Sequence, residues 1–208
     1  GIWSTGSAWS TTSGSFTSAD AGAGGGQDAV FNLAENQTIR LNGDQRVNAF
    51  TFSSSGSSVL LGGTTGTPAA NALQLGTALN SGSITINAGA GAVTIGDTSG
   101  VSSAVNLAIA GNQTWANNSS NTFTVANAVA GLAASGTQSL AIGGSGNTSM
   151  LGAITNGTAG GVLSLLKQGA GTLTLSGSNG YTGTTSINAG TLAVNGFLGG
   201  AVNVANAA

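Results

Sequence analysis

The chain has 208 residues, of which only 4% are charged, and its formal net charge is −2. It contains no His and no Cys, so zinc sites built from these side chains are excluded, and the groups used in acid–base or nucleophilic catalysis are scarce. We therefore expect a non-enzymatic protein without a metal or cofactor. Because Lys and Arg are not clustered, we also expect no binding of nucleic acid.

The composition favours an ordered chain over a disordered one. Apolar residues make up 40% of the sequence, and the mean hydropathy is +0.26. Disordered segments combine low hydrophobicity with high net charge, and this chain has neither property. No apolar run approaches the roughly twenty residues that a membrane helix needs, so we expect no membrane span in this chain.

Residues 1–27 differ from the rest of the sequence. Trp3, Trp9 and Phe16 recur at short intervals and are followed by a run of glycines. The last coil of a stacked β-structure exposes apolar core and backbone hydrogen-bonding groups, and such an end needs a cover. Two interpretations remain open: the segment is an N-terminal cap, or its aromatic residues form a docking surface for the next molecule.

Residues 28–208 consist of short runs with apolar residues at alternate positions, separated by turns rich in Gly, Asn and Ser. Strict alternation is typical of a strand with one buried face. The pattern predicts strands at 29–33, 37–41, 47–52, 58–61, 72–75, 83–86, 92–95, 105–109, 122–125, 139–142, 162–166, 172–175, 185–187, 191–194 and 201–204. Their spacing of roughly ten residues indicates an all-β fold.

Three features favour a parallel β-solenoid over a sandwich or barrel. Similar triplets recur with similar turns, as in ITI at 84–86, VTI at 93–95 and LTL at 173–175. The strands are short, and charged residues are nearly absent, whereas a sandwich carries many on its outer face. Stacked coils place equivalent side chains about 4.8 Å apart, where like charges repel and Ser, Thr and Asn can hydrogen-bond. With roughly twenty residues in each coil, we expect about ten coils.

A segment near the C-terminus carries the most specific pattern of the chain. Its residues are Leu166, Lys167, Gly169, Gly171, Thr172, Leu173, Leu175, Gly177, Asn179, Tyr181, Gly183, Thr185, Ile187, Gly190 and Leu192. In these residue types and spacings the segment resembles the autotransporter-associated β-strand repeat, also called the passenger-associated transport repeat. The clearest copy spans 166–196, whereas the preceding strands resemble the family only weakly.

This resemblance implies a right-handed β-helix displayed outside a Gram-negative-type bacterial cell, secreted or at the cell surface, as one part of a long passenger. Two departures from the family pattern bear on that expectation. The chain has one clear copy, where family members often have several. It also has no C-terminal amphipathic β-barrel, so either the barrel belongs to a longer precursor or the product is not anchored in that way.

Three single residues allow a functional and a structural interpretation. For Lys167 we expect a stem that lies over the strand and an ammonium in solvent. For Tyr181 we expect packing over a corner, with the hydroxyl hydrogen-bonded, instead of sugar binding. For Asp97, in the sequence GDTSG, we expect an Asx turn, because calcium-binding solenoids repeat an Asp in every unit and this chain does not.

The leading functional hypothesis is an extracellular structural rod that joins end to end with copies of itself into a fibre or matrix. The candidate self-association residues are Trp3, Trp9, Phe16, Phe197, Val202 and Val204. The alternative is an adhesin or spacer segment of a passenger, with host or cell-surface glycans as further candidate partners. A polysaccharide lyase and an ice-binding solenoid are disfavoured, because charged residues are scarce and the T-x-T pairs at 122–124 and 172–174 are sparse.

Overall fold

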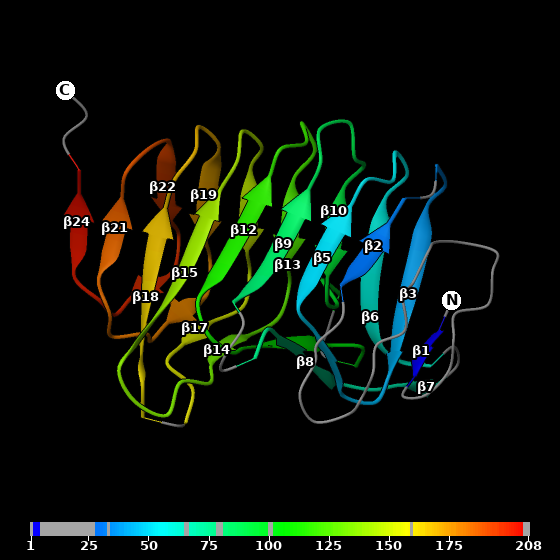
Figure 1. Ribbon diagram of the computed structural model, residues 1–208, viewed down its shortest axis with the longest axis horizontal. Helices are drawn as coiled ribbons and strands as arrows, with labels where there is room; N and C mark the ends of the chain where they lie inside the picture. Colours follow the sequence, from blue (N-terminus) through cyan, green and yellow to red (C-terminus); the bar gives the residue numbers. More distant parts are fainter. Residues whose placement is uncertain are drawn as a thin grey trace.

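The structure is a computed structural model that describes residues 2–4, 28–32, 34–64, 67–77, 81–99, 102–158 and 160–205. Every helix or strand assigned in this part of the chain is a β-strand. It contains no helix of the length and hydropathy needed to cross a membrane. The strands stack side by side into an elongated rod, with β1 (Ile2–Ser4) and β24 (Val202–Val204) at opposite ends (Figure 1).

Two long sheets run along the rod. The first long sheet consists, in order, of β1, β3 (Gln37–Asn42), β6 (Ser58–Thr64), β10 (Val93–Ile95), β13 (Phe123–Val125), β16 (Thr148–Met150), β19 (Thr172–Leu175) and β22 (Thr191–Val194). The second consists of β2 (Ala29–Phe31), β5 (Ala49–Phe52), β9 (Gly82–Ile86), β12 (Gln113–Asn117), β15 (Thr137–Gly143), β18 (Val162–Lys167), β21 (Thr185–Ile187) and β24. Neighbouring strands along both sheets are parallel.

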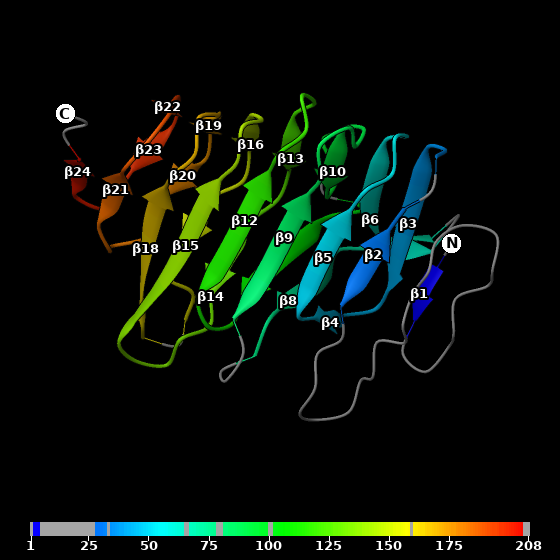
Figure 2. The same ribbon diagram turned by 45° about the horizontal axis from the view of Figure 1, so that its top comes forward.

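A third side of the rod is formed by a shorter parallel sheet. It consists of β4 (Gln45–Val47), β8 (Asn71–Leu75), β11 (Val105–Ile109), β14 (Val129–Gly131) and β17 (Ile154–Thr155), and the pair β20 (Ser178–Asn179) and β23 (Phe197–Leu198) follows it toward the C-terminal end. The short strand β7 (Thr67–Pro68) pairs antiparallel with β6. The chain thus passes repeatedly through three sheets (Figure 2), which confirms the predicted parallel β-solenoid.

The coils differ in length along the rod. Val93 pairs with Phe123, thirty residues further on, whereas Thr172 pairs with Thr191, nineteen residues further on. Most coils are therefore longer than the expected twenty residues. For this reason eight strands stack along each long sheet over the described residues, compared with the roughly ten expected coils.

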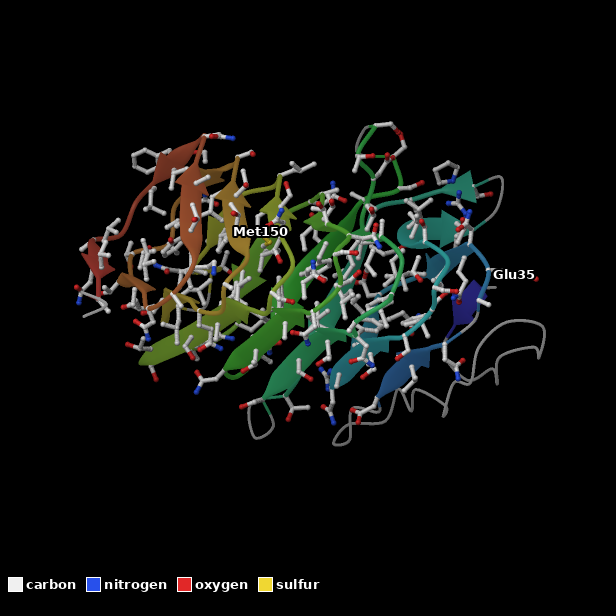
Figure 3. All side chains as sticks on the ribbon, turned by 90° about the horizontal axis from the view of Figure 1, so that it is seen from above. Glu35 and Met150 are labelled. Atoms are coloured by element: carbon white, nitrogen blue, oxygen red, sulfur yellow. The ribbon has the colours of Figure 1, made fainter. Side chains whose placement is uncertain are left out.

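The core consists of side-chain columns that run parallel to the rod axis. Parallel pairing in register places one inward residue of each coil directly over that of the next. In the first long sheet this column is Ile39, Leu60, Ile95, Val125, Met150, Leu175 and Val194. In the second it is Ala29, Phe50, Ile84, Trp115, Ile142, Lys167, Ile187 and Val204. Figure 3 labels Met150 within this interior and the exposed Glu35 toward the β1 end.

Glycines allow successive coils to approach closely at one corner. Gly144, Gly169 and Gly190 follow β15, β18 and β21 and have φ angles of +97°, +73° and +70°. A Cβ atom added to Gly169 would lie 2.5 Å from the backbone N of Gly144, and one added to Gly190 would clash with the carbonyl oxygen of Gly169. Only glycine fits such a stacked left-handed turn without strain.

The predicted division of the chain is only partly covered by the described residues. The solenoid extends through the described part of 28–208, as far as residue 205. Within the predicted cap or docking segment 1–27, only β1 is described, and its residues pair in register with Arg40, Leu41 and Asn42 of β3. The cap interpretation and the docking interpretation both stay predictions.

Candidate functional site

The described part of the chain holds no group of three or more His, Cys, Asp or Glu residues that could bind a metal ion. The feature that separates one region from the rest is instead the final coil. We call residues 185–204 the C-terminal coil; they comprise β21, β22 and β23, together with β24, which begins a further turn by pairing with β21. Its strands β22 and β24 end the two long sheets at the same end of the rod (Figure 2).

The C-terminal coil exposes apolar side chains that continue the buried columns. Val194 stacks on the fully buried Leu175 and is 41% exposed, and Val204 stacks on Ile187 and is 64% exposed. Val202 and Phe197 are 52% and 60% exposed. The coil carries no charged residue. The end of the rod is therefore an uncharged, partly apolar surface bordered by two strand edges.

The structure brings three of the predicted self-association residues together in this coil: Phe197 on β23, and Val202 and Val204 on β24. Trp3 lies at the opposite end, on β1, where its backbone pairs in register with Leu41. Trp9 and Phe16 lie outside the described residues. Val194 is a further exposed apolar residue of this coil that is not among the predicted self-association residues, although its alternation with Leu192 in the predicted strand 191–194 is a signal in the sequence.

Lys167 does not send its ammonium to solvent, so the sequence-based expectation for this residue is wrong. Its side chain is only 2% exposed and lies inside the rod, in the column between Ile142 and Ile187. The alternation that buries Leu163 and Leu165 on β18 also directs Lys167 inward. The position of Lys167 two residues after Leu165 is therefore the sequence signal that places its side chain on the inward face. Burial lowers the pKa of the Lys167 ammonium below its ordinary value.

The Lys167 ammonium donates hydrogen bonds to backbone carbonyl oxygens of two successive corners. Two of the acceptors, Gln168 at 2.9 Å and Gly169 at 2.8 Å, follow β18 in its own coil. The third, Ala189 at 3.1 Å, belongs to the corresponding corner of the C-terminal coil. A buried cation thus connects one coil to the next through polar contacts to the main chain.

Asn179 forms a second polar connection between coils. Its side chain is fully buried. Its Oδ1 accepts from the backbone N–H of Ile154 at 3.0 Å, and its Nδ2 donates to the carbonyl oxygens of Gly177 and Phe197 at 2.9 and 3.0 Å. The side chain therefore links the preceding coil to the C-terminal coil.

Tyr181 and Asp97 have the structural roles that the sequence predicts. Tyr181 is fully buried, and its hydroxyl shares a hydrogen bond of 2.6 Å with Oγ1 of Thr185. Burial raises the pKa of Tyr181 above its ordinary value. Asp97 accepts at Oδ1 from the backbone N–H and the hydroxyl of Ser99, at 2.9 and 2.7 Å, and at Oδ2 from the N–H of Ser103 at 3.3 Å. The expected Asx turn is confirmed.

The buried Lys167, Asn179 and Tyr181 all fall within one sequence unit. Residues 165–194 match the passenger-associated-transport-repeat family. The resemblance expected from the sequence is thereby confirmed for this segment. The repeat is associated with the passengers of bacterial autotransporters, which suggests a secreted or surface-located product. No curated protein and no solved structure matches the chain.

The matched repeat is larger than a single coil. It runs from the end of β18 through β19, β20 and β21 to the end of β22. The strands β18 and β21 pair with each other, and so do β19 and β22. The repeat therefore contains neighbouring strands of both long sheets, together with the polar side chains that join them. It encodes a coil and the stacking of the next coil on it.

Proposed function

We propose that the chain is a non-enzymatic extracellular structural segment, a β-solenoid rod that stacks end to end with further copies of itself. The proposal rests on the C-terminal coil, because the two columns of inward residues end there in the exposed side chains of Val194 and Val204. A second copy placed there in the same strand direction would continue both columns. Strand edges that continue a parallel stack are suitable templates for β-augmentation.

Two further observations support end-to-end contact between copies. The rod begins with β2 and ends with β24 in the second long sheet, so a head-to-tail contact joins two different surfaces and propagates along the axis. The sequence has no charged residue after Lys167, so the C-terminal end places no like charges against a neighbouring copy. Exposed Val194, Phe197, Val202 and Val204 would lose water-accessible apolar surface on contact.

The extracellular location rests on the repeat match at 165–194. The same match supports a second candidate function, a spacer or stalk within an autotransporter passenger. In that case further coils of the same polypeptide would cover the C-terminal coil. Both functions use the rod as a mechanical element, and they differ in what stacks on its end.

Paired substitutions at the end and at the side of the rod test self-association. Val202→Lys with Val204→Lys places two charges on the edge strand β24. The control, Leu132→Lys with Leu151→Lys, places the same charges at exposed apolar residues after β14 and β16, in the middle of the rod. We expect sedimentation velocity at micromolar concentration to show concentration-dependent assemblies for the native chain and for the control, and monomers for the β24 variant. If the native chain is monomeric at all concentrations, self-association is rejected, and the spacer or stalk function is the candidate that remains.

A further inference from the structure

Lys167 is the one lysine of the chain, and the position it occupies is unusual for a cation. In the inward column of the second long sheet its neighbours are the aliphatic side chains of Ile142 and Ile187. The column positions before Ile142 are likewise apolar, as in Trp115 and Ile84. A methionine would fill a similar volume without a charge, so packing alone does not explain a lysine here.

Among the residues that the structure describes, no carboxylate side chain belongs to the coils around Lys167. All five carboxylate residues of the sequence lie at or before Asp97, which follows β10. Two strands, β13 and β16, separate β10 from β19 in the first long sheet. No titratable side chain lies on β15 or β21, or on the corners 168–171 and 188–190 that surround Lys167. Apart from Lys167 itself, Tyr181 is the titratable residue that follows Asp97 in the sequence. The charge is therefore held by main-chain dipoles.

The three carbonyl acceptors show what this charge does. Gln168 and Gly169 precede β19, and Ala189 precedes β22, so the ammonium joins equivalent corners of two stacked coils. The tight glycine stack at the same corner brings these carbonyl groups within reach of one ammonium, and a Cβ atom added to Gly190 would lie 2.7 Å from Nζ. Hydrogen bonds from a charged donor are stronger than those between neutral groups.

We propose that Lys167 is a positioning residue whose side-chain amino group holds the corner of the C-terminal coil on the corner of the coil beneath it. In this role the lysine sets the register of β21 and β22 on β18 and β19. The inference is independent of what covers the C-terminal coil, so it stands or falls separately from the proposed self-association.

Two physical effects oppose each other here, and their balance decides the proposal. Replacing a buried charge by an apolar side chain of similar volume is often neutral or stabilising, because the cost of desolvation disappears. Removing the donor also leaves buried carbonyl groups without it, which is destabilising. Because one ammonium serves three carbonyl oxygens in two coils, we expect the second effect to prevail locally, in the C-terminal coil.

Hydrogen exchange followed by mass spectrometry on Lys167→Met tests this directly. We expect amides of 185–204 to exchange at least tenfold faster than in the native chain, with amides of 105–142 unchanged. The control is Leu165→Met, which replaces a buried side chain on the same strand, β18, without removing a hydrogen-bond donor. It should leave exchange in 185–204 within twofold. Equal or slower exchange of this segment in Lys167→Met would overturn the proposal.

The pH profile gives a readout that side-chain packing alone would not move. Because burial lowers the pKa of Lys167, the unfolded coil binds more protons than the folded coil between that lowered pKa and the ordinary value of 10.5. We therefore expect the stability of 185–204 against opening to rise with pH in this window, because the neutral amine keeps N–H donors for the corner carbonyl groups without the cost of a buried charge. The rise should vanish in Lys167→Met. A native chain without the rise would show that the ammonium is not held in the interior.

A measurement on the native chain keeps the proposal testable if Lys167→Met does not fold. Since the chain has a single lysine, an amine-reactive acylating reagent reports on that side chain, and peptide mapping separates it from the terminal amine. We expect Lys167 to react only as fast as amides of 185–204 open to exchange. Acylation of Lys167 as fast as that of a free lysine derivative would show that its amino group is not held in the interior and would overturn the proposal.

Discussion

Asn179 accepts a hydrogen bond from the backbone N–H of Ile154 at 3.0 Å and donates one to the carbonyl oxygen of Phe197 at 3.0 Å. One buried side chain thus contacts the main chain of the coil before it and of the coil after it. Asn179→Ala would leave these buried groups without their partner. We expect a loss of about 2–4 kcal/mol in unfolding free energy, measured by urea denaturation. Asn203→Ala, at an exposed position of β24, is the control and should change it by less than about 0.5 kcal/mol.

The glycine corner predicts a second effect. Gly169→Ala forces a side chain into a left-handed turn with φ of +73° and against the backbone of Gly144. We expect a loss of more than about 2 kcal/mol in unfolding free energy. A Cβ added to Gly180 meets no atom within 4 Å. Gly180→Ala therefore serves as the control, and equal stabilities of the two variants would contradict the stacked corner.

The column of buried side chains in the first long sheet predicts that a cavity at Met150 destabilises the rod. Met150, which is labelled in Figure 3, is 1% exposed and pairs in register with Val125 on one side and Leu175 on the other. Met150→Ala should create a cavity and lower the unfolding free energy by about 2–5 kcal/mol. Leu151→Ala, at the adjacent exposed position, should cost less than about 1 kcal/mol. Thermal denaturation followed by circular dichroism would show the difference as separate midpoints, and a reversed order would place the wrong residue in the core.

Tyr181 predicts an alkaline limit of stability. Its folded-state pKa is raised above the ordinary value of 10.0, so the unfolded chain loses the phenolic proton first. The stabilising contribution is present below about pH 10 and is lost as pH rises through the folded pKa. We expect the thermal unfolding midpoint of the native chain to decrease as the pH is raised above 10. The midpoint of Tyr181→Phe should decrease less steeply over the same range. Identical profiles would show that Tyr181 ionises as readily in the folded chain as in the unfolded one.

The predicted strands follow from alternation where several inward residues are apolar, as in Leu173 and Leu175 on β19. The short strands β14, β16 and β17 carry a single large apolar inward residue each and were not predicted. The same rule failed at β12, whose inward residues include the buried polar side chains Gln113 and Asn117. These amides are satisfied by main-chain carbonyl groups of other coils and turns, for example Gln113 by Leu75 and Asn117 by Asn147. Such contacts join residues of neighbouring coils that lie 38 and 30 positions apart in the chain, so they leave no local signal in the sequence.

For the C-terminal coil, the sequence points to the exposed apolar residues but not to the buried position of Lys167. Phe197, Val202 and Val204 are predicted self-association residues, and the structure places them on β23 and β24 with exposed fractions of 60%, 52% and 64%. Their role in self-association stays a prediction. The burial of Lys167 was missed because a single cation normally favours solvent, and the carbonyl groups that hold it belong to two different coils. Its parity on β18 pointed inward, but the cost of an uncompensated charge argued against that position.

Cryo-electron microscopy of the purified chain at micromolar concentration shows directly whether copies of the rod stack end to end. We predict filaments in which the strand repeat of about 4.8 Å continues along the axis from the C-terminal coil of one copy into the first coil of the next. Single rods without end-to-end contacts, at every concentration examined, would contradict it.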